Sequence, residues 1–345
     1  MKFLNTFFSA SLFYTSCAIF ALTLVGCNQT ATSEKNNGSG KVDETSQAEN
    51  AESRQYDFVY GATINDVPEN AKVRVWFPIA QSSSQQTVNR TADKTPTELV
   101  TNVDAKYGNK IGYFESTSTN APITFSLEYD VKRLEASVDD AAKDLSAEQK
   151  QLFLSANSLV PVDGKPQKQF KDVEVPDDSM AAGQKLYDVV EQHMKYDKSK
   201  AGYGKGDAEW ACDSKTGNCT DFHSLFISLA RSNNIPARFE IGFPLPNDKT
   251  EGKIGGYHCW AWFFAEGSGW APVDISEADK HPEMKDYYFG KLTADRIAFS
   301  KGRDIELVPK SETGPLNYFV YPHVEVDGKL WPKDKIELNF SFKDK

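Results

Sequence analysis

Cysteine is scarce in this chain, with five among 345 residues, which excludes a small scaffold held together by many disulfides. Positive charge is also in deficit, because 39 Lys and Arg stand against 49 Asp and Glu for a net charge of -10. A nucleic acid is therefore not expected as the main partner, since neutralising phosphates requires a basic face. Apolar residues still make up 39% and aromatic residues 12%, which predicts a folded, acidic, globular protein with a sizeable core.

The first 26 residues have the pattern of a secretory signal, with one charged residue, Lys2, before an apolar stretch over 7–25. The tetrapeptide Leu24-Val25-Gly26-Cys27 resembles a bacterial lipobox, in which Cys27 is acylated and becomes the new N-terminus. The alternative is an N-terminal transmembrane anchor, because the apolar stretch approaches the roughly 20 residues that span a bilayer. Both interpretations predict export, and the lipobox predicts a membrane-anchored lipoprotein of the cell envelope, facing the periplasm or the surface.

Polar content and apolar periodicity divide the chain further. Residues 27–55 are too polar to form a core, whereas the following zone alternates as strands do and predicts a small antiparallel β-sandwich. That zone contains neither His nor Cys, so we expect it to bind or orient rather than catalyse. The predicted segments are a lipoprotein signal peptide at 1–26, a disordered tether at 27–55, a β-sandwich domain at 56–135, a helical connector at 136–178 and a catalytic domain at 179–345.

Two further expectations concern secondary structure. A polar stretch over 136–157 predicts a helix, with Ser146 and Gln149 as a capping box. Alternating apolar residues over 291–310 and 317–342 predict strands that complete the sheet of the catalytic domain without contributing chemistry.

The strongest chemical signal surrounds Cys219. Apolar residues at helical spacing follow it, so a helix is predicted to begin near Asn218 or Cys219. A cysteine at a helix N-terminus meets unpaired backbone N–H groups and the positive end of the helix dipole, and both favour the thiolate. The same N–H groups could stabilise an oxyanion on an attacked carbonyl. This position therefore suits acyl transfer.

A base and an orienting acid follow in order. His258 begins a buried strand, and Gly269-Trp270-Ala271-Pro272-Val273-Asp274 is a turn and short strand that ends in a carboxylate. If these two strands pair antiparallel, Asp274 lies beside His258 and fixes its tautomer. Cys219, His258 and Asp274 then form a nucleophile, a base and an orienter.

These motifs together resemble the transglutaminase-like core. The residues that carry the resemblance lie within about 183–310 and are Gly217-Asn218-Cys219-Thr220-Asp221, Asn234-Ile235-Pro236-Ala237-Arg238, His258-Cys259-Trp260 and Gly269 to Asp274. The resemblance implies an α+β fold with a papain-like transglutaminase core, here preceded by the small antiparallel β-sandwich. It implies a catalytic triad of Cys219 as nucleophile, His258 as general acid and base, and Asp274 as orienter. It does not select among cross-linking enzymes, cysteine peptidases and amidases.

Several alternatives stay open at the level of sequence. His223, four residues after Cys219, is a rival base. Trp210 is a candidate oxyanion donor through its indole N–H, or else part of a cleft wall. Cys212, Cys219, His223 and His258 have ligand types that suit zinc, although their spacing is not a common structural one. No calcium loop is recognisable, and no metal or cofactor is expected.

The remaining thiols suggest a disulfide. Cys17 would leave with the signal peptide and Cys27 would be acylated, so three thiols would persist in an oxidising envelope. If Cys219 stays reduced, Cys212 and Cys259 are the natural pair.

The sequence thus predicts a cysteine acyl-transfer enzyme that forms a thioester with peptide or side-chain amides and resolves it by hydrolysis or transamidation. Its expected partners are a protein, peptide or cell-wall amide and, through the lipid anchor, the membrane. The alternatives are a binding module without catalysis that keeps the groove, and a zinc hydrolase.

Overall fold

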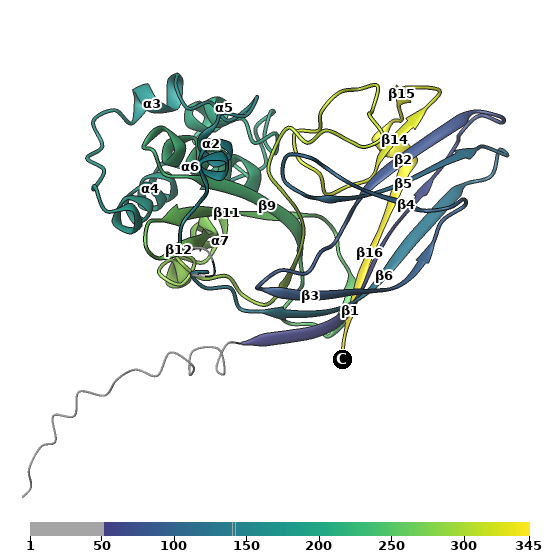
Figure 1. Ribbon diagram of the computed structural model, residues 1–345, viewed down its shortest axis with the longest axis horizontal. Helices are drawn as coiled ribbons and strands as arrows, with labels where there is room; N and C mark the ends of the chain where they lie inside the picture. The colour runs from purple at the N-terminus through teal and green to yellow at the C-terminus, as the bar shows by residue number, and fades with distance from the viewer. Residues whose placement is uncertain (1–51, 140, 142) are drawn as a thin grey trace, which may run out of the picture. The chain divides into compact units, whose positions relative to one another are not determined.

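The computed structural model describes residues 52–139, 141 and 143–345 (Figure 1). The predicted signal peptide, the acylation site Cys27 and almost all of the predicted tether lie outside these residues. The described residues group into one compact unit, whose first strand, β1, begins at Ser53, within the predicted tether. Among the helices of the described ranges, none has the length and apolar character of a membrane span.

Two five-stranded antiparallel sheets form the predicted β-sandwich. Buried and more exposed residues alternate along β6 because one of its faces packs against the opposite sheet. The first sheet has the order β10-β16-β1-β6-β3, with bounds Glu251–Lys253, Ile336–Asp344, Ser53–Ile64, Ile123–Leu134 and Gln86–Lys94. The second has the order β15-β14-β2-β5-β4, with bounds Lys329–Leu330, His323–Val326, Lys72–Ile79, Lys110–Thr117 and Val100–Val103.

The C-terminal strands belong to this sandwich, so their predicted place in the catalytic sheet is wrong. β16 pairs with β1 over nine positions, from Tyr56 opposite Asp344 to Ile64 opposite Ile336, and β14 pairs with β2. Alternation identifies a strand, but its partner is chosen by long-range packing that the local pattern does not encode. Only the stretch 291–310 behaves as predicted, since its strand β13 pairs with β9 of the catalytic part.

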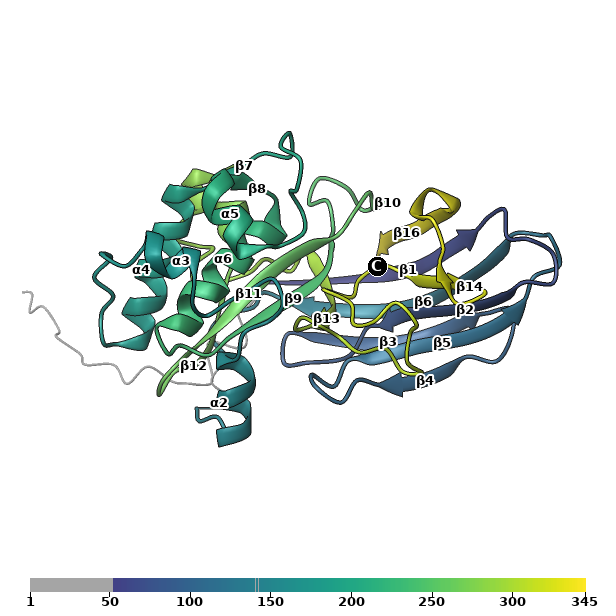
Figure 2. The same ribbon diagram turned by 90° about the horizontal axis from the view of Figure 1, so that it is seen from above.

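The predicted catalytic part combines a four-stranded antiparallel sheet with helices. Helix α6 packs on β9 and β11, and α4 and α5 pack on α6 (Figure 2). The sheet has the order β12-β11-β9-β13, with bounds Gly269–Val273, His258–Ala265, Ala237–Pro244 and Arg296–Lys301. The remaining elements are α2 (Ala147–Leu154), α3 (Lys165–Gln169), α4 (Ser179–His193), α5 (Ala208–Ser214), α6 (Cys219–Ser232), α7 (Ile275–Lys280), the parallel pair β7 (Lys195–Tyr196) and β8 (Thr216–Gly217), and the 3₁₀ turns η1 (Pro282–Met284) and η2 (Lys333–Lys335).

The helix predicted over 136–157 is shorter than expected. Ser146 and Gln149 form the predicted capping box, and the helix that they cap, α2, runs from Ala147 to Leu154. Ala136 instead forms a β-bridge with Leu292, and Asp139 forms one with Trp270. Backbone pairing with distant segments therefore outweighs the helical preference of the first residues.

One aromatic core joins the sandwich to the catalytic sheet. The Tyr60 ring of β1 lies 5.1 Å from the Phe299 ring of β13 and 6.1 Å from the Phe243 ring of β9, measured between centroids. All of these side chains are buried. This packing holds β9 and β13, and through them β11 with His258, against the sandwich.

Candidate active site

Cys219 is the first residue of α6, as the sequence predicts. Asn218 is the N-cap, and its side-chain oxygen accepts a hydrogen bond from the backbone N–H of Thr220 at 3.0 Å. Asp221 closes the capping box by accepting from the backbone N–H of Asn218 at 2.9 Å. The Cys219 thiol therefore lies at the positive end of the helix dipole, where a thiolate is stabilised.

Asp221 also fixes the loop in front of α6. Its carboxylate accepts hydrogen bonds from the backbone N–H groups of Gly204 at 2.7 Å and Gly206 at 2.9 Å. Both glycines have positive φ angles, at +80° and +62°, which L-residues other than glycine rarely adopt. The carboxylate thus ties a tight loop to the helix that carries the thiol.

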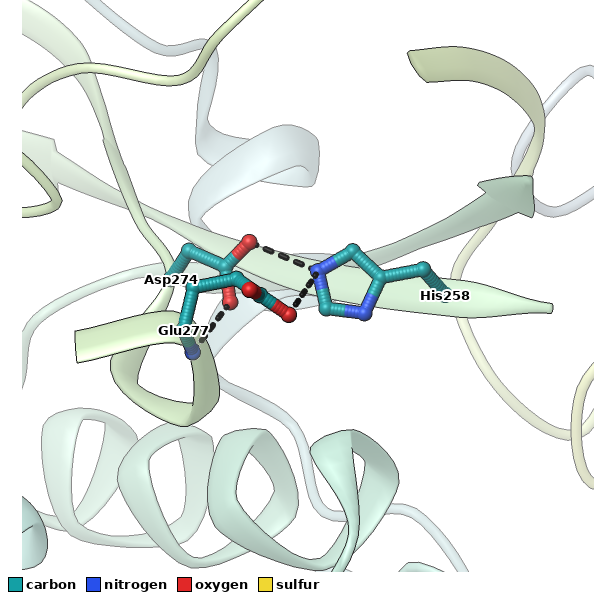
Figure 3. A group of neighbouring side chains, drawn as sticks. All are labelled: His258, Asp274 and Glu277. Carbon is teal, nitrogen blue, oxygen red and sulfur yellow. Dashed lines mark hydrogen bonds and ion pairs between the residues drawn. The ribbon is translucent and has the colours of Figure 1, made fainter. Parts of the chain in front are cut away.

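His258 and Asp274 meet because β11 and β12 pair antiparallel. Ala261 lies opposite Val273 in this pairing, so Asp274 directly follows the end of β12. Its Oδ2 lies 2.7 Å from His258 Nε2 (Figure 3). The predicted arrangement of these two strands is confirmed, and the hydrogen bond leaves His258 Nδ1 as the ring nitrogen available to the sulfur.

Asp274 is fully buried, and both of its carboxylate oxygens accept hydrogen bonds. Oδ2 also accepts from Arg296 Nη1 at 2.9 Å. Oδ1 accepts from the Ser276 hydroxyl at 3.1 Å and from the backbone N–H of Glu277 at 3.2 Å, which makes Asp274 the N-cap of α7. The carboxylate is therefore rigidly placed, and its charge is available to His258.

The three side chains form a coupled charge system. Burial opposes ionisation of the Cys219 thiol, but hydrogen bonds from Cys259 and His258, together with the charge of His258, hold its pKa well below the ordinary value. Burial also opposes the charge on His258, yet the charge and hydrogen bond of Asp274 and the contact with Cys219 raise its pKa to about 10. Burial likewise opposes ionisation of Asp274, but His258 and Arg296 hold its pKa far below the ordinary value. Near neutral pH the site is a thiolate–imidazolium pair.

This charge state predicts how Cys219 reacts with iodoacetamide. The alkylation rate of Cys219 should change little between about pH 6 and about pH 9, because the thiolate is already formed, whereas the rate of an ordinary thiol rises about tenfold per pH unit until the pH approaches its pKa of about 8.5. Cys212 is the internal control, since burial raises its pKa. The measurement is the extent of labelling of each cysteine-containing peptide by mass spectrometry. A Cys219 rate that climbs with pH as steeply as that of an ordinary thiol contradicts the ion pair.

The thiol lies at a large open cavity. The cavity has a volume of about 820 Å³, and only 3% of the Cys219 surface is exposed. Besides Asn218 and Cys219, its wall comes from the segment before α5, the Gly255-Gly256-Tyr257 segment before β11, the C-terminal stretch at 316–323 and Lys333. A chain segment with an amide bond can reach the sulfur from this side.

His223, the rival base, lies beneath the site. It is fully buried, and its Nε2 accepts a hydrogen bond from the backbone N–H of Ile275 at 3.1 Å. Burial lowers its pKa. An imidazole that accepts from the backbone and has no exposed surface cannot exchange protons with a substrate, so the geometry selects His258.

The predicted Cys212–Cys259 disulfide is wrong, because both residues are free thiols. Cys259 points into the site, where its sulfur lies 3.7 Å from His223 Nδ1 and hydrogen-bonds Cys219. Cys212 lies on α5. The reason is the packing of the elements: β11, which carries Cys259, packs on α6, whereas α5, which carries Cys212, lies against α6.

Two further sites suggested by the sequence do not form in the structure, namely an oxyanion donor at Trp210 and a zinc site. The indole Nε1 of Trp210 lies only 2.6 Å from the position that a Cβ would take at Gly202, and Trp210 is not among the described residues that line the cavity. The zinc set of Cys212, Cys219, His223 and His258 does not converge either. Within the described ranges, the one group with three metal-ligating side chains close together is His258, Asp274 and Glu277 (Figure 3). A protonated His258 and the guanidinium of Arg296 beside Asp274 make that group a poor cation site.

The sequence did not identify two kinds of residue that lie at the site. Arg296, on a strand to which no chemistry was assigned, neutralises Asp274. Tyr318 and Tyr321 line the cavity from the C-terminal stretch. Aromatic residues at 318 and 321 were visible in the sequence, but nothing local distinguishes a cleft wall from a core strand.

Part of the chain is similar to a known protein family. Residues 169–275 match the model of the transglutaminase-like superfamily. An uncharacterized protein of Haemophilus influenzae is 35% identical over 169 residues, which cover 40% of this chain and 46% of that protein. The chain thus spans about half the length of this curated relative.

One solved structure shows the same fold at low sequence identity. A proposed cysteine protease from Cytophaga hutchinsonii superimposes with a TM-score of 0.51 at 15% identity, covering 84% of this chain and 100% of that one. The periplasmic domain of TgpA from Pseudomonas aeruginosa reaches a TM-score of 0.35 at 14% identity, over 67% of this chain and 90% of that one. The part of the chain that carries Cys219, His258 and Asp274 is thus similar to the transglutaminase-like superfamily.

Proposed function

We propose that this protein is a cysteine acyl-transfer enzyme that acts on peptide or side-chain amides through a thioester at Cys219. The observation that carries the proposal is the thiol at the first position of α6, hydrogen-bonded to His258, whose Nε2 is held by the buried Asp274 at 2.7 Å. A buried thiolate beside an oriented imidazolium, at an open cavity, has the parts that nucleophilic catalysis requires.

Each step of the proposed reaction uses groups already in place. The Cys219 thiolate attacks the amide carbonyl, and the N–H groups of the first turn of α6 stabilise the oxyanion. The C–N bond then breaks as the imidazolium of His258 gives its proton to the departing amine, which leaves a thioester on Cys219. His258, now neutral, takes a proton from water or from a second amine, and that nucleophile releases the acyl group.

The experiment that tests this function distinguishes hydrolysis of the thioester from transfer of the acyl group to an amine. Glutamine-containing peptides are incubated with the protein, with and without a primary amine, and ammonia and the amine–peptide product are measured separately. We expect ammonia release that depends on Cys219, and product with the added amine reports transfer rather than hydrolysis. A protein whose Cys219 alkylates rapidly but which turns over no amide in a broad peptide panel is a binding module, and the proposal then fails.

We further propose that the protein works in the cell envelope, attached to the membrane by a lipid on Cys27. The support is the pattern of residues 1–27, with an apolar stretch followed by Gly26 and Cys27. The polar residues after Cys27 would let the folded part reach protein, peptide or cell-wall amides away from the bilayer.

A further inference from the structure

The cavity beside Cys219 differs in charge from the rest of the protein. The chain has a net charge of -10, yet three lysines, Lys198, Lys205 and Lys333, line this cavity. Among the described residues that line it, none is Asp or Glu. A basic cleft on an acidic protein focuses the attraction for anions at the reactive sulfur.

These lysines are available to a ligand. All three are exposed, and within the described ranges none forms an ion pair with a carboxylate, whereas Lys195 pairs with Asp279 and Lys285 with Asp188. Lys198 contacts only an aromatic ring there, with its Nζ 5.5 Å from the centroid of Tyr196. Their charges are thus left uncompensated at the cavity.

Aromatic rings and open backbone form the rest of the wall. Five tyrosines line the cavity, and the Tyr257 ring packs against the rings of Tyr318 at 5.6 Å and Tyr321 at 5.7 Å between centroids. Gly255 leaves space where a side chain would project, since a Cβ there would meet no atom within 4 Å. Flat tyrosine faces beside a bare backbone segment suit an extended peptide.

We propose that the amide substrate is an acidic peptide, whose carboxylates are recognised by Lys198, Lys205 and Lys333. This inference rests on the proposed function, because it assigns the substrate class of the same site. Lys198 and Lys205 lie in the loop before α5, and Lys333 begins η2 near the C-terminus, so the charges come from separate segments. Single charges set among aromatic faces fit carboxylates spaced along a peptide, whereas a contiguous phosphate polymer calls for a dense cluster of cations that includes the bidentate guanidinium of Arg.

The test measures binding without turnover. In the full-length Cys219→Ala protein, binding of fluorescein-labelled Gly-Glu-Gln-Glu-Gly and Gly-Lys-Gln-Lys-Gly is followed by fluorescence polarisation. We expect the acidic peptide to bind about tenfold more tightly than the basic one, and this preference to weaken as salt is added. Adding Lys198→Glu, Lys205→Glu and Lys333→Glu should cancel or reverse the preference.

A matched triple variant controls for total charge. Lys110→Glu, Lys132→Glu and Lys185→Glu change the net charge by the same amount at exposed positions outside the cavity, and should leave the preference within about twofold. Equal binding of the two peptides, or an equal loss in both triple variants, overturns the proposal. Because Cys219→Ala removes the chemistry, this result is independent of whether the native protein turns over amides, so a failure of the proposed function is recognised separately.

Discussion

Replacing Cys219 with Ala should reduce amide turnover by about 10⁴-fold or more, because the other thiol at the site, Cys259, is fully buried and burial raises its pKa. The fold should survive, since the change removes one sulfur atom at a helix N-terminus and costs on the order of 1–2 kcal/mol of unfolding free energy. The measurements are the ammonia-release assay and a thermal unfolding curve for the same preparation.

Cys212→Ala is the matched control for this prediction. Cys212 is also a free, buried cysteine, but it lies on α5 and burial raises its pKa. Its replacement should leave turnover within about twofold of the native value, because it does not touch the reacting atoms. Substantial turnover in Cys219→Ala, or an equal loss in both variants, would disprove the assignment of the nucleophile.

Replacing Asp274 with Asn should damage both activity and stability. An amide cannot support the imidazolium of His258 as a carboxylate does, and we expect turnover to fall by about 10³- to 10⁴-fold. The same change leaves the Arg296 guanidinium, 3% exposed, without its counter-charge at 2.9 Å. Removing one partner of a buried ion pair costs roughly 3–5 kcal/mol of unfolding free energy.

The stability loss in Asp274→Asn should depend on pH in a defined direction. The pKa of Asp274 is depressed in the folded state by His258 and Arg296, against the effect of burial. Its contribution to stability is therefore fully present above the unfolded carboxyl pKa of about 4 and declines as the pH falls below that value. Denaturant unfolding should show the full difference between native and variant near about pH 7 and a smaller one near about pH 3.

Glu277→Gln is the control for the Asp274 prediction. The Glu277 carboxylate lies 3.8 Å from His258 Nε2, and its side chain is 19% exposed. It is beyond hydrogen-bond distance and partly solvated, so its neutralisation should cost less than about tenfold in turnover. If Glu277→Gln is as damaging as Asp274→Asn, then Asp274 is not the residue that orients His258.

The start of α6 shows what local sequence can predict. Capping residues, helical apolar spacing and the positions of Cys219, His258 and Asp274 along the chain are all local, and the structure brings these three side chains together. The same holds for the pairing of β11 with β12, because a short turn leaves two adjacent strands little other choice.

The contacts that the sequence did not predict all join residues that lie far apart in the chain. Arg296 reaches Asp274 only because β13 pairs with β9. Cys259 faces Cys219 rather than Cys212 because of the side from which α6 packs on β11. In each case the residue type was visible in the sequence, but its neighbour depends on packing between elements that no local pattern specifies.

The sequence by itself determined the position of Cys219 at a helix N-terminus, the histidine and aspartate at the ends of neighbouring strands, and the alternation of the sandwich strands, since each of these depends on short-range backbone geometry. Only the tertiary structure decided that the C-terminal strands close the sandwich, that Arg296 balances the buried carboxylate, and that lysines from separate segments line the cavity beside the thiol. Those features depend on which distant surfaces pack together, a choice made by burial of the whole aromatic core rather than by any single stretch of chain.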